Sequence, residues 1–423
     1  MERVFYGWRI VAVAFVTHCV TTGIVFYSFG VFLQALTEQF GWSRAEVSLG
    51  FSLVSACGAF YAPLVGRVVD RRGSRPPQLV GAMAMALGFL GLRSIQSLAQ
   101  FYLLMGLVVS FGATALGALP SNAAVARWFV RRRGQALGVA TAGISMGGVI
   151  FVPLTQWLVQ HLGWRSAFGW LACLILAMAV PPVALFMRRS PESMGLRPDG
   201  ALEPLPGDPS IVAEIERSLS PGDALRTSNF WLITAAFSLT GAGLSATLLH
   251  QIAFLRDRGL SPSAAAWVLG ATAGVGVVGK LGFGALLDRF GQRRVILLCF
   301  ALQAVGLVFL MLPTSAATLI PFVLVYGFAM GGNATLWATV VAACFGRLHY
   351  GAIAGAMTPF IVSMQATAIP LAGAVRDRSG DYLPAFFAIL VATAAAIGCA
   401  ACIAPVAEPR GASHRLDIPG VGA

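Results

Sequence analysis

The sequence predicts an all-α membrane protein, with twelve transmembrane helices in two pseudo-symmetric six-helix bundles. Of its 423 residues 57% are hydrophobic and 11% are charged, whereas about 25% charged residues would be ordinary for a soluble domain. The apolar residues gather in twelve runs, each long enough to cross a hydrocarbon core of about 30 Å. The second half of the chain also repeats the first. Only helices or closed barrels satisfy the backbone in lipid, and the ten-residue alternation typical of barrel strands does not occur.

The runs follow one another with short polar turns between them. They lie near 9–36, 46–69, 78–97, 101–126, 135–160, 166–187, 229–255, 263–287, 294–313, 318–343, 351–375 and 384–405. The first run is long and meets no small-residue cleavage site, which favours a retained helix over a signal peptide. A Pro-, Gly- and charge-rich stretch in the middle predicts a cytoplasmic linker. We expect an N-terminal bundle over 1–187, the linker over 188–227, a C-terminal bundle over 228–405 and a cytoplasmic tail over 406–423.

Basic residues predict the orientation. With the N-terminus inside, 21 of the 28 arginines fall on the cytoplasmic side, as the positive-inside rule requires. This predicts the cytoplasmic (inner) membrane, with both termini in the cytoplasm. The net charge of +12 then reflects topology, and we expect no nucleic-acid partner. All seven cysteines lie within predicted helices, where cysteine usually packs as a small hydrophobe, so neither a metal site nor a cofactor is expected.

The two halves repeat at an offset of about 218 residues. One charged loop occurs in both: Gly66, Asp70, Arg71, Gly73 and Arg75 match Gly284, Asp288, Arg289, Gly291 and Arg293. An aspartate at the end of one helix can face the positive N-terminus of another, while glycines permit a tight turn. We interpret the two loops as a conformational latch. The alternative is a charged turn that only sets topology.

This loop resembles the signature of the major facilitator superfamily, and the resemblance covers all twelve helices. The fifth-helix stretch 127–143, Arg-Trp-Phe-Val-Arg-Arg-Arg-Gly-Gln-Ala-Leu-Gly-Val-Ala-Thr-Ala-Gly, is similar to the signature of the monocarboxylate transporter family, in a bacterial-type form. Leu162-Gly-Trp-Arg-Ser-Ala-Phe168 and Tyr6-Gly7-Trp8 fit the same family. The resemblance implies the major facilitator fold and secondary transport by alternating access.

Lys280 is the only lysine in the chain, and it falls in the middle of a predicted helix. Such a charge costs roughly 2.5–3.5 kcal/mol on insertion scales and is functional by default. All 17 acids lie in loops or at helix ends, so no buried carboxylate is available as its partner. Lys280 is therefore expected to bind an anionic substrate. A structural lysine, or one deprotonated by burial, is the alternative.

Four further residues are candidate substrate ligands: His250, Tyr27, Asn333 and Gln365. Each has the alternative of ordinary hydrogen bonding between membrane helices, and His18 is a weaker candidate. The family resemblance places Lys280 at a basic position of the eighth helix. It also places Gly276 where a proton-handling aspartate is expected, and Tyr27 where many members have a lysine.

The stretch Gly143-Ile-Ser145-Met-Gly147 matches the serine-hydrolase pattern Gly-x-Ser-x-Gly. That motif needs a strand-to-helix elbow, whereas this one lies inside a helix, where small residues let helices approach closely. We expect a transporter and not an enzyme. The predicted function is alternating-access transport of a small organic anion, a monocarboxylate, with or without proton symport, by a monomer in the bilayer. An oxalate/formate-type dicarboxylate antiporter and an efflux transporter of other small molecules are the alternatives.

Overall fold

The computed structural model describes residues 5–200 and 218–404, and the regular structure of that part is helical. The predicted tail 406–423 and linker residues 201–217 lie outside the described residues. The helices of the first half are α1 (Gly7–Thr21), η1 (Thr22–Tyr27), α2 (Phe29–Phe40), α3 (Arg44–Arg72), α4 (Arg75–Leu92), α5 (Leu98–Leu103), η2 (Leu104–Val109), α6 (Ser110–Leu116), α7 (Ala118–Trp128) and α8 (Arg133–Phe186).

Three short helices belong to the connection between the halves: η3 (Glu192–Met194), η4 (Pro198–Gly200) and α10 (Pro221–Arg226). The helices of the second half are α11 (Ser228–Asp257), α12 (Pro262–Phe290), α13 (Gln292–Met311), α14 (Ala316–Pro321), η5 (Phe322–Tyr326), α15 (Gly327–Phe345), α16 (Tyr350–Ser379) and α17 (Leu383–Ala401).

Ten of the described helical stretches are long and apolar enough to cross a membrane. One of them, α8, holds two of the predicted spans, because Gly163 takes a non-helical conformation with φ 76° in its middle. A further predicted span corresponds to α4, 18 residues long, which opens on the polar sequence Arg-Pro-Pro-Gln. The described chain therefore contains twelve helical segments of membrane length, as the sequence predicts.

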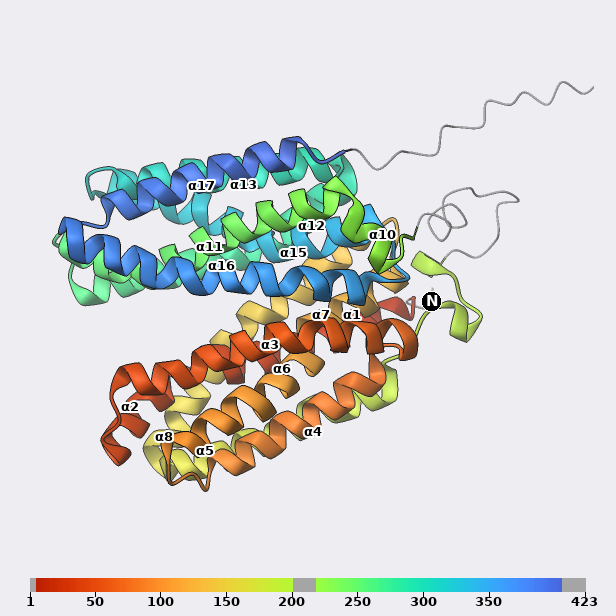
Figure 1. Cartoon of the computed structure of the whole chain (residues 1–423), viewed down its shortest axis with the longest axis horizontal. Helices are drawn as coiled ribbons and strands as arrows, with labels where there is room; N and C mark the ends of the chain where they lie inside the picture. The colour runs from red at the N-terminus through yellow and green to blue at the C-terminus, as the bar shows by residue number, and fades with distance from the viewer. Residues whose placement is uncertain (1–4, 201–217, 405–423) are drawn as a thin grey trace, which may run out of the picture.

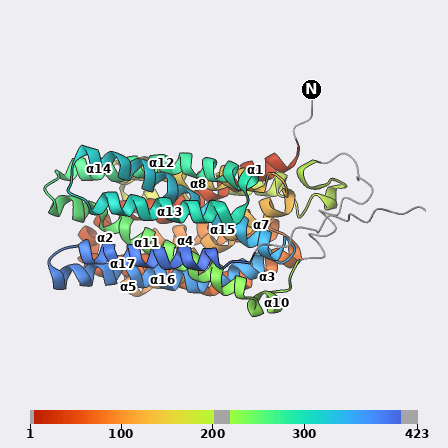
Figure 2. The same cartoon turned by 90° about the horizontal axis from the view of Figure 1, so that it is seen from above.

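The two halves form separate bundles whose long helices run side by side (Figures 1 and 2). They meet at the end of the molecule where the described chain begins, and there α3 packs against α16, and α12 against α8. The contact is apolar: Val65 and Val69 of α3 share a buried cluster with Ile353 and Met357 of α16. We call this the latch end.

The outer surface carries large apolar side chains. Phe60 is 77% exposed and Trp267 is 78% exposed. Side chains of this kind are costly in water but not in lipid, where the hydrocarbon is as apolar as they are. The protein is an integral, multi-pass membrane protein.

Candidate functional site

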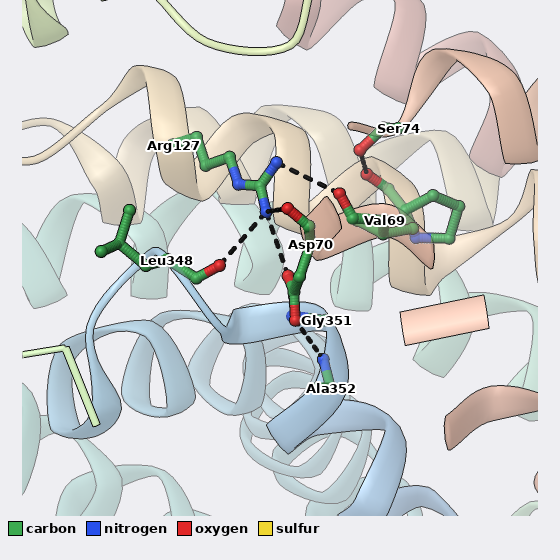
Figure 3. A network of polar contacts seen from close by, with 8 residues as sticks. Val69, Asp70, Ser74, Arg127, Leu348, Gly351 and Ala352 are labelled. Atoms are coloured by element: carbon green, nitrogen blue, oxygen red, sulfur yellow. Dashed lines mark hydrogen bonds and ion pairs between the residues drawn. The ribbon is translucent and has the colours of Figure 1, made fainter. Parts of the chain in front are cut away.

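Asp70 joins the two bundles at the latch end. It lies at the last turn of α3, and its carboxylate accepts hydrogen bonds from the backbone N–H of Gly351 (2.9 Å) and of Ala352 (2.7 Å) at the start of α16. Figure 3 shows these bonds together with Arg127 of α7, whose guanidinium lies 3.0 Å from the Asp70 carboxylate. The first turn of a helix has free N–H groups and a partial positive charge, so it favours an anion.

Asp288 makes the corresponding contact in the opposite sense. It lies near the end of α12, and its two oxygens accept hydrogen bonds from Gly134 (2.7 Å) and Gln135 (2.9 Å) in the first turn of α8. Each half therefore sends one aspartate onto a helix N-terminus of the other. The two contacts differ in their surroundings, since the Asp70 side chain is 7% exposed whereas Asp288 is exposed.

The glycines of the repeated loop allow these contacts. A Cβ on Gly66 would clash with the Gly351 carbonyl, and one on Gly284 would clash with the Gly134 carbonyl. Close backbone approach thus requires glycine at both crossings. Gly73 (φ 81°) and Gly291 (φ 77°) form the turns that follow, in a conformation that disfavours side chains.

The loop arginines have lesser contacts. Arg71, Arg75 and Arg289 are exposed. Arg293 donates to the Ala401 carbonyl at the end of α17, within its own half.

Lys280 lies in the seam between α12 and α8, eight residues before Asp288, and is 6% exposed. Its Nζ donates to the hydroxyl of Ser145 on α8, 2.8 Å away. This is its one polar side-chain partner in the described part of the chain, where no carboxylate lies within ion-pair distance. Thr141 and Thr335 make a second hydroxyl contact across the halves, at 2.9 Å.

A cavity of about 460 Å³ lies between the bundles. On α3 it is lined by Ala62, eight residues before Asp70, and on α16 by Thr358, seven residues after Gly351. At about 1.5 Å per residue, the cavity begins about 10–12 Å beyond the latch contacts. Asn333 of α15 and Gln365 of α16 line it, whereas Lys280, His250 and Tyr27 are not among the lining residues of the described chain.

The remaining candidates have protein partners or are about half exposed. His250 Nε2 lies 3.0 Å from the Ile369 carbonyl, within the second bundle. Tyr27 is 46% exposed, and its ring lies beside Gly148. His18 is buried and its Nε2 lies 3.1 Å from Asn122 Oδ1. The structure therefore brings Asn333 and Gln365 together at the cavity and keeps the other candidates apart from it.

Comparison with known proteins decides the family. The family model described as the Major Facilitator Superfamily matches residues 13–364 and 232–415. The chain belongs to the major facilitator superfamily. Membership makes it a secondary transporter and not an enzyme, and the Gly-x-Ser-x-Gly match at Ser145 lies within helix α8.

Individual relatives and solved structures are also similar to this superfamily member. It is 30% identical over 385 residues to monocarboxylate transporter 13 of Bos taurus, a match that covers 90% of this chain and 85% of that protein. This relative is an animal protein, so the bacterial-type form expected from the sequence is not supported. The fold is similar to that of XylE, a proton:xylose symporter (TM-score 0.73, 14% identity, 93% of this chain and 94% of that chain). It is also similar to the transporter FucP (TM-score 0.71, 16% identity, 94% and 98%).

Thr21 and Trp337 are among the polar residues of this transporter that the sequence did not single out. Both line the cavity. Thr21 Oγ1 and Trp337 Nε1, like Asn333 Nδ2, are buried without a hydrogen-bond partner in the described structure. The spacing of Asn333 and Trp337, four residues apart on one helix, was the available signal, because residues at that spacing share a face.

Proposed function

We propose that the protein transports a small organic anion, a monocarboxylate, and that Lys280 supplies the charge that binds it. The observation that carries this proposal is the environment of Lys280, a buried ammonium whose one described side-chain partner is the neutral hydroxyl of Ser145. A buried charge is costly unless it is paired. A carboxylate that enters the seam would supply the missing counter-charge. The similarity to an animal monocarboxylate transporter supports the same class of substrate.

Alternating access would bring Lys280 within reach of the substrate. In the described structure the latch end is closed, because Asp70 and Asp288 hold each half on the other. Separation of α12 from α8 would break the contact of Asp288 with Gly134 and the contact of Lys280 with Ser145. We place the latch end at the cytoplasmic face of the membrane, with the N-terminus, because the arginine-rich loops gather there.

The surroundings of Gly276 bear on proton coupling. A Cβ at this position would lie 2.9 Å from the terminal methyl of Met330 on α15. The position where the family resemblance expects a proton-carrying aspartate thus faces the apolar end of a methionine side chain. This favours movement of the anion without an obligatory proton through that position.

The proposal is tested by uptake of labelled monocarboxylates and dicarboxylates into proteoliposomes. Wild type and Lys280→Ala are compared, with and without a pH gradient. We expect uptake of a monocarboxylate by wild type and loss of that uptake in Lys280→Ala. Equal uptake by the two proteins would refute the role of Lys280. If a pH gradient drives uptake by wild type, only the proposal that the anion moves without proton coupling is refuted.

A further inference from the structure

A short segment of the connection between the halves, residues 187–200, lies at the latch end (Figure 1). It begins at Met187, which is buried directly after α8, and it contains η3 and η4. Its far end is held on the same half, because the carboxylate of Asp199 accepts hydrogen bonds from three consecutive backbone N–H groups, those of residues 130–132, at 2.9–3.2 Å. We call this segment the strap. Both of its ends are thus attached to the first half.

The middle of the strap contacts the second half. Glu192 of η3 accepts a hydrogen bond from the guanidinium of Arg347, with 2.8 Å between Oε1 and Nη2. The Arg347 side chain follows α15 and is buried, whereas that of Glu192 is half exposed. Glu192 is the one carboxylate within ion-pair distance of Arg347 in the described chain. A segment attached to one half therefore supplies the counter-charge for a buried arginine of the other half.

Arg347 is itself part of the contact between the halves. Its guanidinium also donates to the Arg127 carbonyl at 2.9 Å, and the Arg127 guanidinium donates to the Leu348 carbonyl at 3.3 Å. Arg127 in turn pairs with Asp70 (Figure 3). Polar contacts thus run without interruption from Glu192 to Asp70, and contiguous networks of this kind can carry energetic coupling between their ends.

The strap holds Glu192 in place by its own hydrogen bonds. The Pro191 carbonyl accepts from the backbone N–H groups of Met194 (2.9 Å) and Leu196 (3.0 Å), and Pro191 is buried. Gly195 completes the turn with φ 68°, a conformation that glycine adopts without steric cost. A loop that is fixed at both ends and closed in this way loses little conformational freedom when its glutamate forms an ion pair.

We propose that the strap is a third fastening of the closed latch end, which holds the second half on the first through the pair Glu192–Arg347. When the halves separate at the latch end, the strap moves with the first half and Arg347 with the second, so this pair breaks together with the aspartate contacts. The connection then sets how often the latch end opens. This inference goes beyond the proposed function, since it does not depend on which solute is carried.

Amide hydrogen exchange of the purified protein tests the strap. The N–H groups of Gly351 and Ala352 exchange when the Asp70 contact opens, and their exchange rate reports the population of the open form. Glu192→Gln removes the charge and keeps the length of the side chain. We expect exchange in the peptide that contains these two amides to become about tenfold faster, which corresponds to ~1.4 kcal/mol, close to the value of one hydrogen bond to a charged group.

Asp223→Asn is the matched control within the same connection. The described hydrogen bonds of the Asp223 side chain and backbone N–H are with Ser220 at the start of α10, so this variant should leave the exchange rate unchanged. Arg347→Gln should speed exchange at least as much as Glu192→Gln does. The double variant should be no faster than Arg347→Gln alone, because two residues that act through one contact do not have additive effects.

Three results would overturn the inference. They are exchange at the wild-type rate in Glu192→Gln, additive effects in the double variant, and equal acceleration by Glu192→Gln and Asp223→Asn, which would assign the effect to the charge of the connection and not to the pair. The exchange is measured without substrate. Failure of the strap therefore leaves the proposed transport of a carboxylate untouched, and a different substrate would leave the strap in place.

Discussion

Ser145 gives Lys280 a neutral partner on the opposite half of the molecule. The bond of 2.8 Å crosses from α12 to α8, and the backbone near it is close, since a Cβ on Gly138 would lie 2.7 Å from the Lys280 carbonyl. A hydroxyl can hold the ammonium in the closed seam without neutralising it. The charge therefore remains available for an anion once the seam opens.

Ser145→Ala should weaken the closed seam but retain transport. Loss of the hydroxyl leaves the buried ammonium without its described partner, at a cost of about 1–3 kcal/mol. The melting temperature of the detergent-solubilised protein should fall, while uptake of the preferred carboxylate persists.

Thr339→Val is the control for that measurement, because the Thr339 hydroxyl bonds within its own helix, to the Thr335 carbonyl. Abolished uptake in Ser145→Ala, with the melting temperature unchanged, would argue against a purely structural role for this serine.

Single residues were the least predictable from the sequence. The sequence shows that Lys280 is costly to bury and that no buried carboxylate is available to pair with it. Its partner Ser145, however, is 135 positions away and belongs to the other half. His250 could be recognised as a titratable group, yet its neighbour is the backbone carbonyl of Ile369. Every residue has a backbone carbonyl, so the sequence does not show which one is the partner. Thr21 and Trp337 line the cavity and lack hydrogen-bond partners in the described structure, and neither property can be read from the residue types.

The paired helix-end contacts follow from the internal repeat. The loops at Asp70 and Asp288 lie 218 residues apart, and each packs a helix end against a helix start of the other half. The offset in the sequence predicts that the two loops are equivalent. It does not predict their difference, because Arg127 pairs with Asp70 whereas no arginine lies within ion-pair distance of Asp288 in the described residues.

That difference predicts unequal latches. Asp70→Asn leaves the buried Arg127 without its counter-charge, which should destabilise the closed latch end by about 3 kcal/mol or more. Asp288→Asn removes an exposed carboxylate from a helix N-terminus, which should cost only about 0.3–1 kcal/mol.

The single lysine makes the two variants easy to compare. A water-soluble amine reagent modifies Lys280 only when the seam opens, and mass spectrometry of the peptide that contains it separates this from reaction at the N-terminal amine. Modification should be markedly faster in Asp70→Asn than in Asp288→Asn. Equal modification rates in the two variants, or wild-type rates in both, would refute the prediction that the Asp70 contact is the stronger of the two.

At the scale of the molecule, the fold was predictable because its causes are spread over many residues. Composition, run length and the repeat together indicate two six-helix bundles, and the described chain has this architecture. Individual boundaries were less predictable, since the break at Gly163 and the polar start of α4 depend on a few residues. The cavity could not be predicted, because it is the space left between the two bundles beyond their contacts at the latch end.

The whole account depends on the charge of Lys280, and the most direct measurement compares Lys280→Arg with Lys280→Gln. Both keep a polar side chain that can donate a hydrogen bond, but only arginine keeps a positive charge. Uptake of the preferred labelled carboxylate into proteoliposomes should be retained in part by Lys280→Arg and lost in Lys280→Gln. If Lys280→Gln takes up the carboxylate as well as Lys280→Arg does, the charge is not the anion's counter-charge and the proposal is wrong.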